Sequence, residues 1–95
     1  MSNLKREMQW DAQTQEKYDE MISKIPLFHR EIIDQVVPIK SEENAVARGA
    51  SCIEEADVVS SFLTEVPKAF YSLMIRLMDE VGFDYKDLIS GGGQK

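Results

Sequence analysis

The sequence predicts an all-α fold, a small bundle of four to five short helices. Over most of its 95 residues, apolar side chains recur at spacings of three and four, which is the period of a helix that buries one face. No run alternates apolar and polar residues strictly enough to predict a strand. The linkers between the expected helices are short, so neighbouring helices should pack directly on one another.

Length and charge exclude several classes of function. A chain of 10.8 kDa holds one domain with one small core. Its net charge of −6 opposes the counterion release that drives nucleic-acid binding, and it is repelled by anionic membranes. Cys52 is the single cysteine, and no apolar stretch is long enough for a membrane span. We therefore expect a cytoplasmic protein that binds neither nucleic acid nor membrane.

Two helices are expected in the first part of the chain. The first covers about residues 11–24, with Asp11 as its N-cap. The second opens at Pro26, because proline lacks the N–H that is unpaired in a first turn. The apolar positions are Trp10, Tyr18, Met21, Ile22 and Ile25 in the first helix, and Phe28, Ile32, Ile33, Val36 and Val37 in the second.

Pro38 is expected to break or kink the second helix. An interior proline removes a backbone hydrogen bond and costs about 3 kcal/mol in a straight helix. A new short helix is then expected over about residues 42–48, after Ser41. Gly49 follows at the position where a left-handed residue ends a helix.

Two more helices are expected in the second half. Ser51 and Glu54 match a capping box, which predicts a helix over about residues 52–65. The clearest apolar stripe predicts a helix over 67–81, closed by Gly82.

The domain organisation follows from these elements. Residues 1–90 are expected to form a single helical domain. Within it, residues 66–89 form the C-terminal helices, including one further turn over 84–89. The glycine-rich residues 91–95 have nothing to bury and are expected to be a disordered tail.

Few side chains have the chemistry of a catalytic or metal site. His29 is the only histidine, and no acidic residue precedes it by three or four positions, as a helical metal pair requires. Cys52 lies near a predicted helix start, where a helix dipole favours a thiolate, but no partner base is visible. A thiol enzyme is therefore only the third hypothesis. We predict no catalytic residue, no metal ligand and no cofactor.

A longer combination of residues carries a family resemblance. An early tryptophan precedes an Ile-Pro-x-Phe-x-Arg sequence, a Glu-x-x-Ala-x-x-x-Gly run and an isoleucine four residues on. These residues are Trp10, Ile25, Pro26, Phe28, Arg30, Glu42, Ala45, Gly49 and Ile53. The pattern over residues 10–59 resembles the PCP_red domain. That family occurs at the C-terminus of the B subunit of light-independent protochlorophyllide reductase, and as small stand-alone proteins.

The resemblance implies a helical module that packs on a larger redox or tetrapyrrole-handling protein. It does not imply the reductase activity, because iron–sulfur clusters need several cysteine ligands and this chain has Cys52 alone. The signature itself is typical of architecture: Pro26 starts a helix, and Phe28 anchors it. Arg30 can bond a carboxylate or a carbonyl, and Gly49 ends a helix.

The sequence thus favours a non-enzymatic protein-interaction or accessory module, because the chain has a small core and no catalytic constellation. The alternative is a binding module for a tetrapyrrole or another flat hydrophobic ligand. Its pocket residues would be Trp10, Phe28, His29 and Phe70.

A homodimer is a further expectation. The apolar positions of the helix over 67–81 cover more than the roughly 100° that a surface helix buries in its own core. Either this helix is central in the bundle, or the excess face pairs with a second copy in an isologous contact; we favour the dimer, because so short a chain has few other helices to surround one. Tyr71 and Ile75, one helical turn apart, would lie in that interface.

Overall fold

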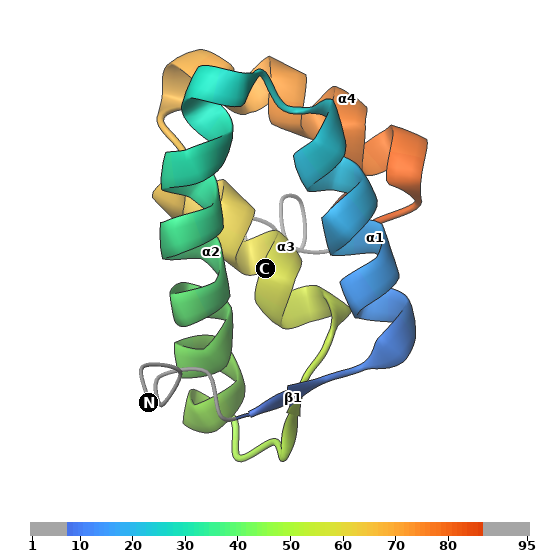
Figure 1. Ribbon diagram of the computed structural model, residues 1–95. Helices are drawn as coiled ribbons and strands as arrows, with labels where there is room; N and C mark the ends of the chain where they lie inside the picture. Colours follow the sequence, from blue (N-terminus) through green and yellow to red (C-terminus); the bar gives the residue numbers. More distant parts are fainter. Residues whose placement is uncertain (1–7, 87–95) are drawn as a thin grey trace.

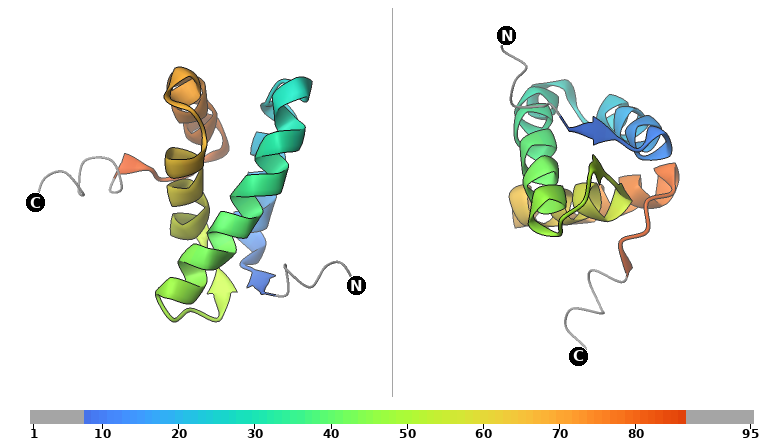
Figure 2. Two further views of the ribbon diagram at one scale, coloured as in Figure 1. Left: turned by 90° about the vertical axis from the view of Figure 1, so that its left-hand side faces the viewer. Right: turned by 90° about the horizontal axis from the view of Figure 1, so that it is seen from below.

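The computed structural model describes residues 8–86, which form four α-helices and one very small sheet (Figure 1). The prediction of a small all-α bundle is confirmed for this part of the chain. α2 packs on α3, and α1 packs on α4. Seen from below in Figure 2, the helices surround a common interior. The predicted tail over 91–95 and residues 87–89 of the predicted turn over 84–89 lie outside the described residues.

α1 (Ala12–Lys24) has almost the predicted bounds. Asp11 is its N-cap, and the Asp11 carboxylate accepts the backbone N–H of Thr14 at 3.1 Å. Tyr18 and Met21 are buried on the side that faces the core. A cap and a stripe, both visible in the sequence, are therefore enough to place this helix.

α2 (Leu27–Ala47) is a single helix of 21 residues that runs through Pro38. The predicted break at Pro38 and the separate helix over 42–48 are therefore wrong. The proline ring is fully buried beside Val37, on the side of the helix that packs on α3. Burial of this apolar surface offsets part of the cost of the backbone hydrogen bond that proline cannot donate.

Both ends of α2 are held by interactions that the sequence predicts. Pro26 is the N-cap, and Arg30 donates to the backbone carbonyls of Ser23 at 3.1 Å and Ile25 at 2.9 Å. Arg30 thereby holds the turn between α1 and α2. At the other end Gly49 has a φ of +76°, a left-handed conformation that favours glycine.

A two-stranded parallel sheet joins the start of the chain to its middle. β1 (Gln9–Trp10) pairs with β2 (Cys52–Ile53), and the N–H of Asp11 donates to the carbonyl of Ile53 at 2.9 Å. The sequence analysis predicts no strand. Two-residue strands are too short to show alternation, so only the tertiary structure reveals this pairing.

α3 (Glu55–Glu65) begins later than predicted, because the residues before it are extended in β2. Its capping box is formed by Glu54 and Asp57 rather than by Ser51 and Glu54. The Asp57 carboxylate accepts the backbone N–H of Glu54 at 2.8 Å. The predicted box and the predicted helix start are therefore wrong.

The last predicted helix, over 67–81, is divided into two elements. A 3-10 turn (Lys68–Phe70) follows Pro67, and α4 (Tyr71–Val81) follows that turn. Gly82, with a φ of +89°, ends α4 as predicted. The helix buries Met74, Leu77, Met78 and Val81.

The hydrophobic core receives side chains from all four helices and from β2. Phe62 on α3 is its largest fully buried side chain. Further fully buried side chains are Met21, Ile25, Val37, Ile53, Val58, Val59, Met74 and Met78. The inner side of α2 is therefore committed to the core, and its other side is left to solvent.

Candidate functional site

All the strongly exposed large apolar side chains of residues 8–86 lie on α2. Five of them define what we call the outer face: Phe28, Ile32, Val36, Ile39 and Val46. Phe28 is 76% exposed and Ile32 is 62% exposed, whereas their neighbour Ile33 is only 7% exposed. A helix that is apolar on both sides is unusual at a protein surface, and such patches mark interaction sites.

The outer face follows the length of α2. Ile32, Ile39 and Val46 are separated by seven residues each, so they stay on nearly the same side of the helix. At 1.5 Å per residue, the 21 residues of α2 span about 31 Å. This is the geometry of a straight stripe that a second helix can follow.

A small cavity lies beside the first turns of α2. It has a volume of about 150 Å³ and lies between the start of α2 and the junction of α3 with α4. Ile32 belongs to both the cavity and the outer face, so the two surfaces are continuous. The lining residues are Ile25, His29, Ile32, Ile33, Val66, Pro67, Phe70, Leu73 and Met74.

His29 is the one polar side chain in this lining, and it lies between two aromatic rings. Its ring centroid is 4.3 Å from that of Phe28 and 4.5 Å from that of Phe70. Three of the four residues predicted for a flat-ligand pocket are thus brought together. The fourth, Trp10, lies in β1, at the opposite end of the molecule from the α1–α2 turn (Figure 1). Its ring centroid is 5.1 Å from that of Tyr18.

The size of the cavity limits what it accepts. A volume of about 150 Å³ matches apolar cavities that hold one benzene ring. Pockets for whole ligands begin at about 300 Å³. The cavity therefore suits a single ring or a branched aliphatic side chain, and it is too small to enclose a tetrapyrrole.

Acidic side chains border the outer face. Glu42 and Glu43 line one shallow hollow with Ile39, and Glu43, Glu65 and Lys40 line a second. Lys40 is the cation of these linings, and its Nζ lies 3.9 Å from the Glu43 carboxylate. One Oε1 atom of Glu42 is buried without a hydrogen-bond partner in the described part of the chain. The rim of the outer face is therefore net negative.

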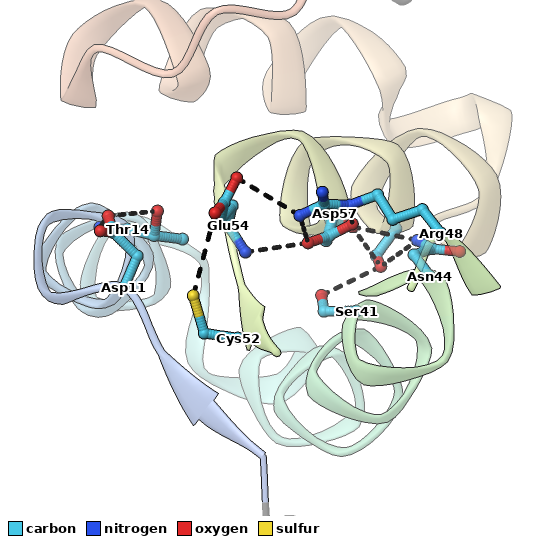
Figure 3. Close-up of polar contacts among 9 residues, drawn as sticks. Asp11, Thr14, Ser41, Asn44, Arg48, Cys52, Glu54 and Asp57 are labelled. Atoms are coloured by element: carbon cyan, nitrogen blue, oxygen red, sulfur yellow. Dashed lines mark hydrogen bonds and ion pairs between the residues drawn. The ribbon is translucent and has the colours of Figure 1, made fainter. Parts of the chain in front are cut away.

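A second cluster of polar residues lies between α2 and α3 (Figure 3). Arg48 forms two hydrogen bonds to Asp57, Nε to Oδ1 at 2.8 Å and Nη2 to Oδ2 at 2.8 Å. The hydrogen bonds that Arg48 donates to Asp57 raise the pKa of the Arg48 guanidinium above its already high usual value, so its charge is permanent. Asp57 also caps α3 through the N–H of Glu54, so both carboxylate oxygens are occupied.

Three neutral side chains extend this cluster. The hydroxyl oxygens of Ser41 and Ser61 are 3.0 Å apart, and Asn44 donates to the Ser61 hydroxyl at 3.2 Å and to the Asp57 carbonyl at 3.1 Å. Each serine hydroxyl also lies within hydrogen-bond distance of a carbonyl of its own helix, and its single proton goes either to that carbonyl or to the other serine. The cluster contains no histidine, and each of its side chains has a structural partner. It therefore joins α2 to α3 and has no free group for catalysis.

Cys52 is half-buried in β2. Its Sγ atom lies 3.9 Å from a Glu54 carboxylate oxygen (Figure 3). Within residues 8–86, no hydrogen bond links the thiol to a basic side chain, and no group of three or more His, Cys, Asp or Glu residues has a metal-binding arrangement. The described residues thus offer no basic partner for the Cys52 thiol that would support the thiol-enzyme hypothesis.

The residues of the family signature have mainly structural positions. The expected anchoring role of Phe28 is wrong, because this ring lies on the exposed outer face. Glu42 is half-buried at the rim of that face, and Trp10 is half-buried against the core. The remaining members are buried, or they cap or hold turns: Ile25, Pro26, Arg30, Ala45, Gly49 and Ile53.

Tyr71 and Ile75, the residues predicted for a dimer interface, are both half-buried on α4. The strongly exposed apolar surface of the described chain lies instead on α2. The predicted break at Pro38 hides this outer face, because it divides α2 into two short helices. The spacing of Ile32, Ile39 and Val46 by seven is the signal that reveals it.

Comparison with known proteins finds no matching family model, no matching curated protein and no matching solved structure. Among the described residues, no helix is both long enough and apolar enough to span a membrane. The site must therefore be interpreted from its own geometry.

Proposed function

We propose that this chain is a non-enzymatic protein-interaction module that docks its partner on the outer face of α2. The observation that carries the proposal is that five of the six exposed large apolar side chains of residues 8–86 lie on this one helix face. A partner that covered this stripe would gain a burial free energy of about 25 cal/mol for each Å² of apolar surface removed from water. A contiguous patch of this kind is typical of a binding surface.

The cavity beside Ile32 supports the same proposal. Interfaces gain most of their binding free energy from a few side chains that fill well-packed pockets. A cavity of about 150 Å³ has the size of one such anchor side chain. We therefore assign it to a residue of the partner, in place of the tetrapyrrole that is the alternative from the sequence.

The nature of the partner protein remains a proposal from the family resemblance. A PCP_red-like module would pack on a larger redox or tetrapyrrole-handling protein in the cytoplasm. The outer face offers an apolar surface for such packing.

The test is affinity capture with the full chain as bait in extract of the native host. The Ile32→Glu/Ile39→Glu variant places two charges on the outer face, and Gln13→Glu/Ser72→Glu places two charges on exposed positions of α1 and α4. Proteins bound by the wild type should stay with the control variant and fall at least about tenfold with the outer-face variant. Circular dichroism confirms that both variants are folded.

The proposal fails if the outer-face variant retains the same proteins as the wild type. It also fails if the wild type captures nothing beyond bare resin.

A further inference from the structure

Resting on the proposed function, we infer that the partner segment is a basic amphipathic helix. It lies along the outer face of α2 and places one aromatic or branched aliphatic side chain in the cavity beside Ile32. The inference names the class of partner, which the proposed function leaves open.

The shape of the outer face favours a helix as its occupant. The stripe runs about 27 Å along the helix, from Phe28 to Val46, because α2 continues through Pro38. Residues spaced by seven remain in contact along a pair of packed helices. Ile32, Ile39 and Val46 have this spacing, so an apolar stripe on a second helix can follow them in register.

The charge of the rim favours lysine and arginine on that helix. Glu42, Glu43 and Glu65 line the hollows of the outer face, where Lys40 is the one cation and is already paired with Glu43. The nearest arginines on α2 are engaged elsewhere: Arg30 bonds backbone carbonyls and Arg48 bonds Asp57. Basic residues flanking the partner's apolar stripe would therefore meet a rim on which three carboxylates face one cation.

The same charges disfavour a second copy of this chain. An isologous dimer places the same patch of each copy against the other. Here it would bring one acidic rim against another, between chains that each carry a net charge of −6. Like charges across an interface oppose association, whereas a basic helix removes the repulsion.

The cavity sets the position of the anchor. It lies beside Ile32, near the N-terminal end of the outer face, and its lining is apolar apart from His29. A phenylalanine or leucine near one end of the partner helix would enter it, while the rest of that helix follows Ile39 and Val46.

Three synthetic peptides of about 20 residues test the inference. The basic probe carries leucines at heptad spacing, one terminal phenylalanine and flanking lysines. The acidic probe has every lysine replaced by glutamate, and the third probe is the basic one with phenylalanine replaced by alanine. Fluorescence anisotropy with the full-length chain should show at least about tenfold tighter binding of the basic probe than of either other probe. The preference for the basic over the acidic probe should weaken as salt is raised.

Matched variants separate the rim from overall charge. Glu42→Lys/Glu43→Lys and Glu16→Lys/Glu20→Lys change the net charge by the same amount, and the second pair lies on exposed positions of α1. The first variant should lose the preference for the basic probe. The control should keep it.

The inference is overturned if the basic and acidic probes bind equally, or if no probe binds at high micromolar concentration. It is also overturned if light scattering shows a wild-type dimer that Ile39→Glu dissociates, since a second copy would then be the occupant. None of these outcomes alters the capture experiment above, so the proposed function and the class of partner can fail separately.

Discussion

The two sides of α2 are both rich in isoleucine and valine, yet they have opposite surroundings. Ile33 and Val37 are buried against the rest of the bundle, whereas their chain neighbours Ile32 and Val36 lie on the outer face. Adjacent residues on a helix point about 100° apart, so one step along the chain moves a side chain from core to surface. The comparison teaches that apolarity alone does not identify the core of this protein.

The two sides also differ in polar content. The inner side carries Ser41 and Asn44, which bond across to α3 and help to fix the two helices relative to each other. The outer face has apolar residues with acids at their rim and no such partner within the described chain. An uncovered apolar surface is typical of a binding site, so we expect the outer face to bind a partner. Polar side chains that are all hydrogen-bonded within the protein are typical of a structural role, which we assign to the inner side.

The largest expected effect comes from a charge placed on the inner side. Val37→Asp buries a carboxylate at a fully buried position, which should destabilise the fold by more than about 4 kcal/mol. Val36→Asp is the matched control on the outer face and should change stability by less than about 1 kcal/mol. Urea unfolding followed by circular dichroism measures both. If both variants lost a similar free energy of unfolding, the assignment of Val37 to the buried side and Val36 to the exposed side would be wrong.

The next effect concerns the ion pair between α2 and α3. Arg48→Met leaves the Asp57 carboxylate without its two guanidinium hydrogen bonds, and a buried charge without its partner is destabilising. The urea midpoint should fall, though by less than for Val37→Asp, because the Arg48 side chain is partly exposed. Adding Asp57→Asn should recover part of the loss. Purely additive losses in this double-mutant cycle would rule out a direct coupling.

A smaller effect of the opposite sign is expected at Pro38. Alanine is more favourable than proline in a helix interior by about 3 kcal/mol. Removing two ring methylenes from this buried position loses about 1.6 kcal/mol at about 0.8 kcal/mol each. Pro38→Ala should therefore stabilise the protein by about 1 kcal/mol, measured as a higher melting temperature. A lower melting temperature would show that the packing of the ring outweighs its cost to the helix.

The smallest effect on stability is expected on the outer face. Ile39→Ser and Val46→Ser change exposed positions and should each alter the free energy of unfolding by less than about 0.5 kcal/mol. Both should reduce the fluorescence of a dye that binds exposed apolar surface. A large loss of stability would show that the outer face is already covered by this chain itself.

The sequence by itself determined the fold class and the helix ends that depend on local interactions. Asp11, Pro26, Gly49 and Gly82 mark those ends as predicted. Each acts through its own φ angle or through hydrogen bonds within one turn, so no distant partner is needed. A small part of the candidate site was also visible: of the four predicted pocket residues, His29 and Phe70 line the cavity, Phe28 lies beside them on the outer face, and Trp10 lies elsewhere.

The tertiary structure decided every feature that joins distant parts of the chain. The burial of the Pro38 ring, which accompanies the continuity of α2, needs the packed bundle, and the late start of α3 depends on the pairing of β2 with β1. The ion pair between Arg48 and Asp57 links the end of α2 to α3, and the spacing of these residues in the sequence does not predict it. The outer face is also decided by the tertiary structure. Because α2 has apolar residues on both sides, only the packing of its neighbours determines which side is buried and which is exposed.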